Sequence, residues 1–260
     1  MSADDNLQDK ALAAGCPHAA RAASLSVRSE APPTAASPEL FTIAQVESLM
    51  AADHPLAITA AWMRRFLGRP HRELGRQGPV CPFVPGAIAQ DTIWLANCSL
   101  GRGDRQAIIE IIGLFRDLFL ELEPKDGDEA QWKAMVIVFP NVAIEDAEVI
   151  DAVQSELKAR FVDAGLMIGE FHERNESPGL RNPGFRPLRS PIPAVAIRHM
   201  VETDLPFLHR TLYPPPLRAD FIRSYLRRLG ASISRNNFDA ALDALVTAEI
   251  EIRTPEEVTT

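Results

Sequence analysis

The chain has 260 residues, of which 46% are hydrophobic, and this is enough for one sizeable core. Its formal net charge of −8 argues against nucleic acid or an anionic membrane surface as a partner. Three cysteines without CxxC spacing argue against a structural zinc site, and the lack of a secretory signal or of an apolar run of about 20 residues predicts a cytoplasmic protein with no membrane partner.

The first 38 residues are rich in alanine, serine and proline and hold few large apolar side chains. Such a composition cannot bury enough apolar surface to fold, so we predict a disordered tail over residues 1–38. Cys16-Pro17-His18 has the side chains of a metal site, but we expect it to be inert because the tail around it is flexible. The folded domain is expected over residues 39–260.

Two amphipathic helices come first in the folded part, over residues 43–50 and 54–67, with Thr42 placed to cap the first. Segment 75–88 follows, and its three glycines and three prolines predict a shaped turn. Strands are predicted over residues 92–98, 134–139, 166–172 and 194–200. The second of these strands is continuously apolar, which is typical of a central strand covered on both faces.

Helices separate the predicted strands over residues 105–122 and 145–164. The first is apolar on most of its circumference, so we expect it to be buried on several sides. The last part of the chain, residues 203–252, reads as a helical extension with helices over 205–212, 217–229 and 237–250. This order of elements predicts one α/β (α+β) domain, in which a mixed central sheet is flanked by helices.

An irregular loop over residues 173–193 separates the last two predicted strands and carries five prolines. Proline fixes φ and cannot donate to a ladder, so we expect a stiff loop that holds its side chains in one geometry. Four apolar side chains recur along it and are expected to anchor it to a core, namely Leu180, Phe185, Leu188 and Ile192.

The same loop concentrates arginines, whose planar guanidinium forks suit carboxylate and phosphate ligands. It carries Arg174, Arg181, Arg186 and Arg189, and Arg198 lies on the next strand. As a group they predict an anion site. For any one of them, the alternative is an ion pair with a surface carboxylate.

Two histidines flank the loop, His172 at the end of one strand and His199 near the end of the next. Histidine is the commonest metal ligand and the usual acid or base near neutral pH, although a strand histidine also serves as a core residue. Cys81, which precedes Pro82 in a turn, is either a thiolate ligand for haem iron or a small packing residue.

The string PGLRNPGFRPLRSPIPAVAIRHM at residues 178–200, with GPVCPF at residues 78–83, resembles the signature of an uncharacterised bacterial domain family. The order of landmarks is also similar to that of the YqcI/YcgG-like haem proteins, several of which are N-oxygenases. The similar pieces are residues 80–83, 138–140 and 177–190. In this chain the cysteine and proline of the turn are transposed and the family's loop histidine has no equivalent, which moves the expected iron ligand to His172.

The second resemblance implies a haem-dependent oxygenase that oxidises a nitrogen, or the adjacent carbon, of an amino-acid-like substrate in specialised-metabolite biosynthesis. His172 would bind the iron, with His199 and then Cys81 as alternatives. The protein partner that such an enzyme implies is a reductase. The sequence indicates no oligomeric state.

In the same interpretation, Arg181, Arg186 and Arg189 would hold the haem propionates or the substrate carboxylate. We assign Arg181 and Arg189 to catalysis, and Arg186 and Arg198 to the cofactor.

Two other functions stay open. A cofactor-free binding or accessory protein would recognise an acidic ligand through the loop at residues 173–193. An enzyme without a metal would use His172 with Glu170 or Glu173 as acid and base.

Overall fold

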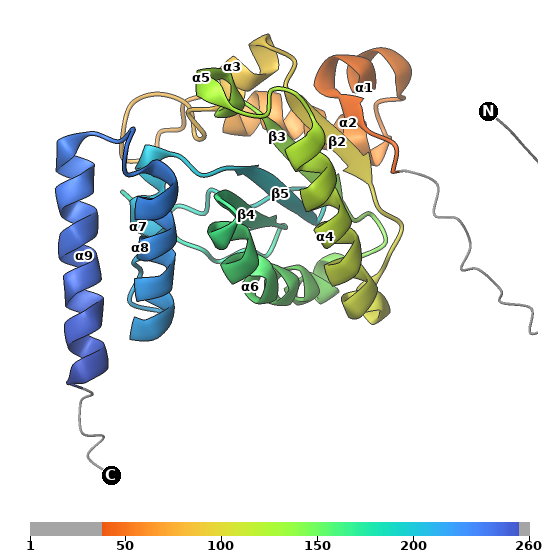
Figure 1. Ribbon diagram of the computed structural model, residues 1–260. Helices are drawn as coiled ribbons and strands as arrows, with labels where there is room; N and C mark the ends of the chain where they lie inside the picture. Colours follow the sequence, from red (N-terminus) through yellow and green to blue (C-terminus); the bar gives the residue numbers. More distant parts are fainter. Residues whose placement is uncertain (1–37, 255–260) are drawn as a thin grey trace, which may run out of the picture. The chain divides into compact units, whose positions relative to one another are not determined.

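Five strands form one mixed sheet in this computed structural model, which describes residues 38–254 (Figure 1). The strands are β1 (Phe41–Thr42), β2 (Ile93–Asn97), β3 (Ala134–Val138), β4 (Leu166–Phe171) and β5 (Ala194–His199). Their order across the sheet is β1-β2-β3-β5-β4. Only β2 and β3 pair in parallel, and the remaining neighbours are antiparallel. The predicted α/β fold with a mixed sheet is therefore confirmed.

Two long helices cover one face of the sheet, α4 (Arg105–Glu121) and α6 (Glu148–Asp163) (Figure 1). In β3, Met135 and Ile137 point toward them and Val136 toward the opposite face, because successive side chains of a strand alternate. The predicted burial of this strand on both faces is confirmed. The prediction for α4 is wrong at Leu114, which is 57% exposed, since α4 buries one stripe and leaves the other side in solvent.

The opposite face is covered by the first part of the chain. Its elements are α1 (Ile43–Leu49), α2 (Pro55–Trp62), a π-helical turn (Met63–Leu67) and α3 (Val84–Ala89). Thr42 caps α1 as predicted, since its hydroxyl accepts from the Gln45 N–H and its own N–H donates to the Gln45 side chain. The predicted turn at residues 75–88 stops earlier than expected, because α3 begins at Val84.

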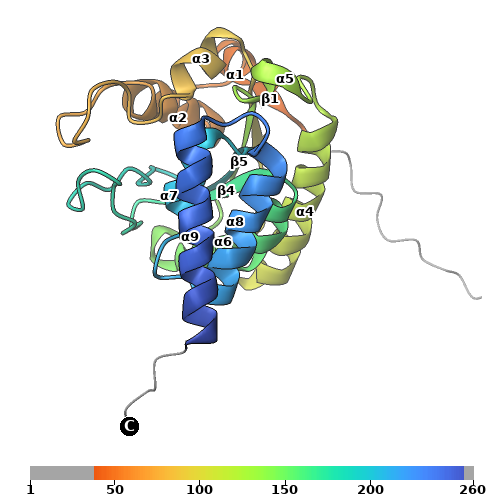
Figure 2. The ribbon, with the colours of Figure 1, turned by 60° about the vertical axis from the view of Figure 1, so that its left-hand side comes forward.

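The C-terminal part is helical, as predicted, and packs at the end of the sheet where β4 begins (Figures 1 and 2). It comprises a 3-10 turn (Glu202–Asp204), α7 (Leu205–Leu208), α8 (Pro215–Leu229) and α9 (Arg235–Arg253). Three shorter elements lie elsewhere, namely α5 (Gly127–Ala130) and 3-10 turns at Arg102–Asp104 and Ile144–Asp146. None of the described helices has the length and apolarity to cross a bilayer.

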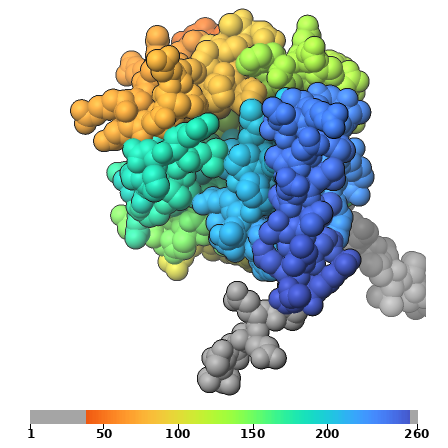
Figure 3. Space-filling model, turned by 90° about the vertical axis from the view of Figure 1, so that its left-hand side faces the viewer, coloured from red at the N-terminus to blue at the C-terminus, as the bar shows by residue number. Residues whose placement is uncertain are grey.

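The predicted loop over residues 173–193 leads from β4 to β5 and docks on the segment that follows the π-helical turn. Figure 3 shows the two segments, green-teal and orange, lying against each other. The Asn182 amide donates to the Glu73 carbonyl at 2.8 Å. Gly75, with a φ of +76°, approaches so closely that a Cβ there would lie 2.9 Å from the Arg181 Cβ. Each segment therefore braces the other.

The expected anchors of this loop behave differently from one another. Phe185 is buried, and Ile192 is partly buried against the same core. Leu188 is half-buried. Leu180 is 57% exposed, so its assignment as an anchor is wrong. The predicted tail up to residue 37, including Cys16-Pro17-His18, lies outside the described residues.

Candidate functional site

The end of β4 delivers two neighbouring side chains to opposite faces of the sheet. Leu166 and Ile168 pack in the core under α6, so Glu170 follows on that same face by alternation. Phe171 points to the other face, where its ring meets Trp62 edge-on at 5.5 Å. The strand therefore brings a carboxyl group to α6, at the point where the chain leaves the sheet.

A buried histidine follows directly and contacts α6. The His172 Nε2 lies 3.0 Å from Asp151 Oδ1 on the first turn of that helix, and the histidine is only 3% exposed. An ionised carboxylate beside Nε2 favours the tautomer that carries its proton there. Nδ1 then keeps a lone pair, and no hydrogen-bond partner for it exists within residues 38–254.

The Glu170 carboxyl group lies near Asp151, and its pKa is raised. Burial raises the pKa of the Glu170 carboxyl above its usual value, and the negative charge of Asp151 raises it further. The Ser177 hydroxyl donates a long hydrogen bond of 3.4 Å to it. A carboxyl group with a raised pKa beside a second carboxylate is the usual arrangement of an acid and base pair.

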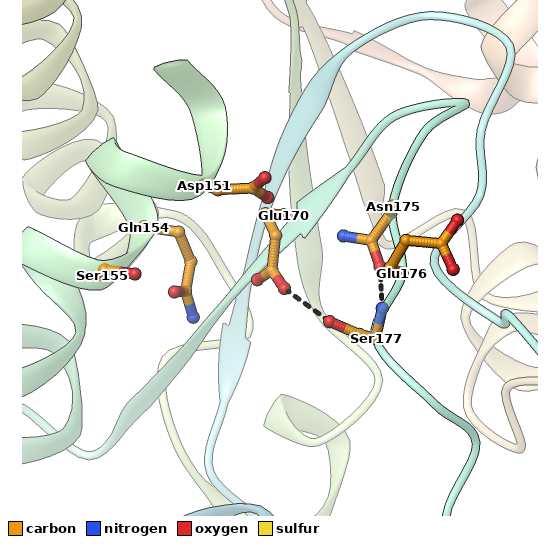
Figure 4. A pocket seen from close by; sticks show the side chains of 7 residues that line it. All are labelled: Asp151, Gln154, Ser155, Glu170, Asn175, Glu176 and Ser177. Atoms are coloured by element: carbon orange, nitrogen blue, oxygen red, sulfur yellow. Dashed lines mark hydrogen bonds between the residues drawn. The ribbon is translucent and has the colours of Figure 1, made fainter. Parts of the chain in front are cut away.

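These side chains surround a pocket of about 350 Å³ between α6 and the start of the loop (Figure 4). In Figure 4, Asp151 and Glu170 lie next to each other, and Glu176 points away from them. Together with these three carboxylates, the lining consists of amides and hydroxyls, from Gln154, Ser155, Asn175 and Ser177. The pocket therefore favours a small polar ligand of positive charge. We refer to it below as the acidic pocket.

Two of the predicted arginines converge, and their common partner is Glu176. Arg186 Nε donates to one of its oxygens at 2.8 Å, and Arg189 Nη2 donates to the other. Arg189 Nε also donates to the Asn175 carbonyl at 3.1 Å. Both guanidinium groups are thereby held in fixed orientations, as expected for a stiff loop.

The other arginines do not join this pair, so the five arginines do not converge as one group, and Arg186 and Arg189 form the ion pair with a surface carboxylate that was the alternative. Arg174 donates to the Glu145 carbonyl at 3.3 Å, and Arg181 is exposed where it packs on Gly75. Arg198 forms a two-pronged ion pair with buried Asp204 and lies over the Phe83 ring. Arg198 therefore acts in the fold, and the physical reason is that Asp204 already neutralises it.

The three alternative iron ligands occupy three separate places. His199 pairs in register with Leu166, and His172 lies six residues beyond Leu166. At about 3.3–3.4 Å per strand residue, the two histidines are roughly 20 Å apart. Cys81 lies on the opposite sheet face, where its N–H donates to the Leu67 carbonyl at 2.9 Å. No group of three or more His, Cys, Asp or Glu side chains suited to a metal occurs in the described part of the chain.

His199 is accounted for by core packing. Its ring lies 5.0 Å from that of Phe119, and its Nε2 is buried without a partner among residues 38–254. Burial, together with the nearby charge of Lys133, lowers the pKa of His199 to about 4. The buried Lys133 ammonium donates to the Phe119 and Leu122 carbonyls at 2.8 and 2.6 Å, where it caps the end of α4.

One family model matches this chain. It is described as a domain of unknown function, DUF6875, and it matches residues 56–239. The chain belongs to this family. No curated protein and no solved structure matches it. The match includes every residue that lines the acidic pocket and ends inside α9.

Haem is the cofactor that the sequence resemblance implies for this DUF6875 domain, and the residues around His172 fit it only in part. The free lone pair at Nδ1, backed by a carboxylate on Nε2, suits a metal ligand. The neighbouring pocket does not suit the porphyrin, because carboxylates and amides stand where a haem needs apolar walls and cationic partners for its propionates.

Sequence reasoning missed the contribution of α6 to this site in the DUF6875 domain. Asp151 and Ser155 are one helical turn apart and appear as ordinary polar positions of an amphipathic helix. The available signal was Gln154, which stands on the buried stripe of α6 between Ile150 and Leu157. Its amide donates to the Ile168 carbonyl at 3.1 Å and joins α6 to β4. A polar residue on an apolar stripe is the kind of exception that marks a site.

Proposed function

We propose that the chain is an enzyme that performs acid/base chemistry on a small, amine-bearing, amino-acid-like molecule in the acidic pocket. The observation that carries this proposal is the pair of carboxyl groups at one end of β4. Glu170 is biased toward its protonated form, and Asp151 is positioned by a buried histidine. A carboxyl group with a raised pKa beside a second carboxyl group in one pocket supplies a proton donor and a proton acceptor together.

Each residue has a distinct role in this proposal. Asp151 binds the substrate cation, and the His172 N–H fixes the orientation of its carboxylate. Glu170 gives its proton to the substrate atom that gains negative charge, and takes the proton back from that same atom in the reverse direction. Ser177 holds the Glu170 carboxyl through its hydroxyl. His172 is a positioning residue, because it lies behind Asp151 and does not line the pocket.

The charge of the pocket supports the choice of substrate class. No lysine, arginine or histidine is among its lining residues, and Arg186 and Arg189 engage Glu176 from outside this lining. An ammonium or guanidinium group gains a favourable charge interaction there, whereas a molecule of net negative charge would be repelled. A volume of about 350 Å³ suits a molecule of amino-acid size.

Calorimetry tests the proposal through proton release. A cation bound next to Glu170 lowers its pKa, so binding of L-arginine or agmatine should release protons to the buffer at pH values above 4.5, where the raised pKa of Glu170 lies. Titrations in two buffers of different ionisation enthalpy measure this release. Glu170→Gln should abolish the release, and Asp151→Asn should weaken binding about tenfold or more, as expected for loss of a charge-assisted hydrogen bond.

The matched control is Glu173→Gln, which removes the alternative carboxyl group three residues along the chain. Glu173 is exposed and does not line the pocket, so this variant should behave as the wild type. Proton release that persists in Glu170→Gln and disappears in Glu173→Gln would assign the chemistry to the wrong carboxyl group. The absence of any binding by cationic probes would overturn the proposal.

A haem-dependent oxygenase acting on a nitrogen of such a substrate, with a reductase partner, is the second candidate. The buried lone pair of His172 Nδ1 is the observation that favours it. Haem titration followed by absorption spectroscopy tests it: a Soret band that His172→Ala removes would support this function. A colourless protein with no spectral change on addition of haem would contradict it.

A further inference from the structure

A second pocket, of about 370 Å³, opens on the opposite face of the sheet from the acidic pocket. Its walls come from two segments that are distant in sequence. Trp62, Phe66 and His71 belong to the end of α2, the π-helical turn and the chain after it, and Phe185, Arg186 and Arg189 belong to the loop. We call it the aromatic pocket.

The aromatic side chains of this pocket support one another. The His71 and Phe185 rings stack at a centroid distance of 4.8 Å, and Phe66 lies 6.1 Å from Phe185 and 6.2 Å from Trp62. The Glu73 N–H donates to His71 Nδ1 at 3.2 Å, which fixes the imidazole ring. These contacts present aromatic surface to a ligand with little entropy left to lose on binding.

The two arginines that line this pocket each keep one guanidinium nitrogen that is not used within residues 38–254. Arg186 is fixed through Nε and Nη1, which donate to Glu176 and to the Pro183 carbonyl. Arg189 is fixed through Nε and Nη2, which donate to the Asn175 carbonyl and to Glu176. In the described chain, Arg186 Nη2 and Arg189 Nη1 have no hydrogen-bond partner, although both arginines are held in place.

We propose that the aromatic pocket binds a small aromatic carboxylate. The ring of the ligand packs against Trp62, Phe66 and His71, and its carboxylate accepts from the unused nitrogens of Arg186 and Arg189. Glu73, which also borders the pocket, and Glu176 offset the charge of the two arginines. This balance favours a single negative charge over a phosphate group, and the volume admits one or two rings.

This site is separate from the proposed catalytic pocket. Asp151 belongs to α6 and Glu170 faces that helix, whereas the aromatic pocket is lined by the end of α2, so a ligand of the second pocket need not contact either carboxyl group. Two residues connect the places: Glu176 lines the acidic pocket and pairs with both arginines, and Asn175 lines it while its carbonyl accepts from Arg189. The proposal therefore stands whether or not acid/base chemistry occurs at Glu170.

Tryptophan fluorescence tests this proposal, with phenylacetate as the probe. Phenylacetate should quench the fluorescence of Trp62 in a saturable manner. Trp62→Phe should lose this quenching, but phenylacetate should still raise its Tm, because phenylalanine keeps an aromatic ring in the pocket wall. Benzylamine, which replaces the carboxylate by an ammonium group, should bind about tenfold or more weakly than phenylacetate. Cyclohexylacetate keeps the carboxylate but has no aromatic ring to stack, and it should also bind about tenfold or more weakly.

Variants then test the two arginines. Arg189→Gln should raise the Kd for phenylacetate about tenfold or more, and Arg181→Gln on the same loop is the matched control that should leave it unchanged. Glu176→Gln should lower the Kd, since the amide oxygen can still accept from an arginine while the negative charge that offsets both guanidinium groups is removed. This second variant keeps the test informative if Arg189→Gln is poorly folded.

The outcomes separate this proposal from the proposed function. Glu170→Gln should bind phenylacetate as the wild type does, so failure of the acid/base chemistry leaves this result intact. Equal affinity for phenylacetate and benzylamine, an unchanged Kd in Arg189→Gln, or weaker binding in Glu176→Gln would each overturn the aromatic carboxylate site.

Discussion

Replacing Asp204 by alanine is the perturbation whose effect follows most directly from the structure. The Asp204 side chain is 1% exposed and accepts from Arg198 Nη1 at 2.7 Å, from Arg198 Nη2 and from the Val201 N–H at 2.8 Å. Arg198 has no other acidic partner among the described residues. The substitution therefore leaves a largely buried guanidinium group without its counter-charge.

The expected cost is large for one substitution. Removing one partner of a buried ion pair costs about 3–5 kcal/mol, because the remaining charge is left uncompensated. Three lost hydrogen bonds to a charged group, at about 1.5 kcal/mol each, give a similar figure. For a domain of this size, about 2–4 °C is lost per kcal/mol, so the Tm of Asp204→Ala should fall by about 6–20 °C.

Urea denaturation and thermal melting followed by circular dichroism measure this loss. Arg181→Ala serves as the control, and it should change stability by less than about 0.5 kcal/mol because Arg181 is exposed. The double variant Arg198→Met/Asp204→Leu should recover much of the loss, since neither charge is then left alone. A cost below about 1 kcal/mol for Asp204→Ala, the value of an exposed pair, would refute the structural role given to Arg198.

Three other predictions follow from single contacts. Gly86→Ala should destabilise the domain by about 1–3 kcal/mol, because the new Cβ would lie 2.7 Å from the Trp132 ring. The Cβ of Gly113→Ala in α4 would meet nothing within 4 Å, so this variant should stabilise the domain by about 0.5–1 kcal/mol. Urea denaturation measures both changes. The lowered pKa of His199, about 4, means that stability falls as the pH drops from 6.5 toward 4, and His199→Phe should lose less over that range in thermal melts. The raised pKa of Glu170 has the opposite sign: stability falls as the pH rises above 4.5, so Glu170→Gln should match the wild type at pH 4 and melt at a higher temperature at pH 7.

The fold could be predicted because hydrophobic periodicity reports burial directly. The continuous apolar run at residues 134–139 gave β3, and the capping position of Thr42 gave the start of α1. The two-residue strand β1 escaped prediction, since Phe41 and Thr42 are too few to show alternation. The exposure of Leu114 was not predicted either, because the sequence does not distinguish an exposed apolar residue of a helix from a buried one.

Sequence patterns predicted only those features of the candidate site that lie close together along the chain. The loop and the placement of Glu170 and His172 at a strand end follow from the order of residues along the chain. Their partner Asp151 lies 21 residues before His172 and meets it through the packing of α6 on β4, which no local pattern encodes. The sequence also did not show which arginines pair with Glu176 and which with Asp204, because these pairs depend on the folded positions of the side chains.

The packing of α9 has a consequence for how the domain opens in solution. α9 lies chiefly against α8, and its buried residues there are two alanines, Ala241 and Ala248. Small side chains remove little apolar area from water, so detachment of this helix costs far less than global unfolding. We expect the amide protons of α9 to exchange with deuterium well before those of β3, so that the native ensemble includes a population with α9 undocked while the sheet and both pockets stay intact.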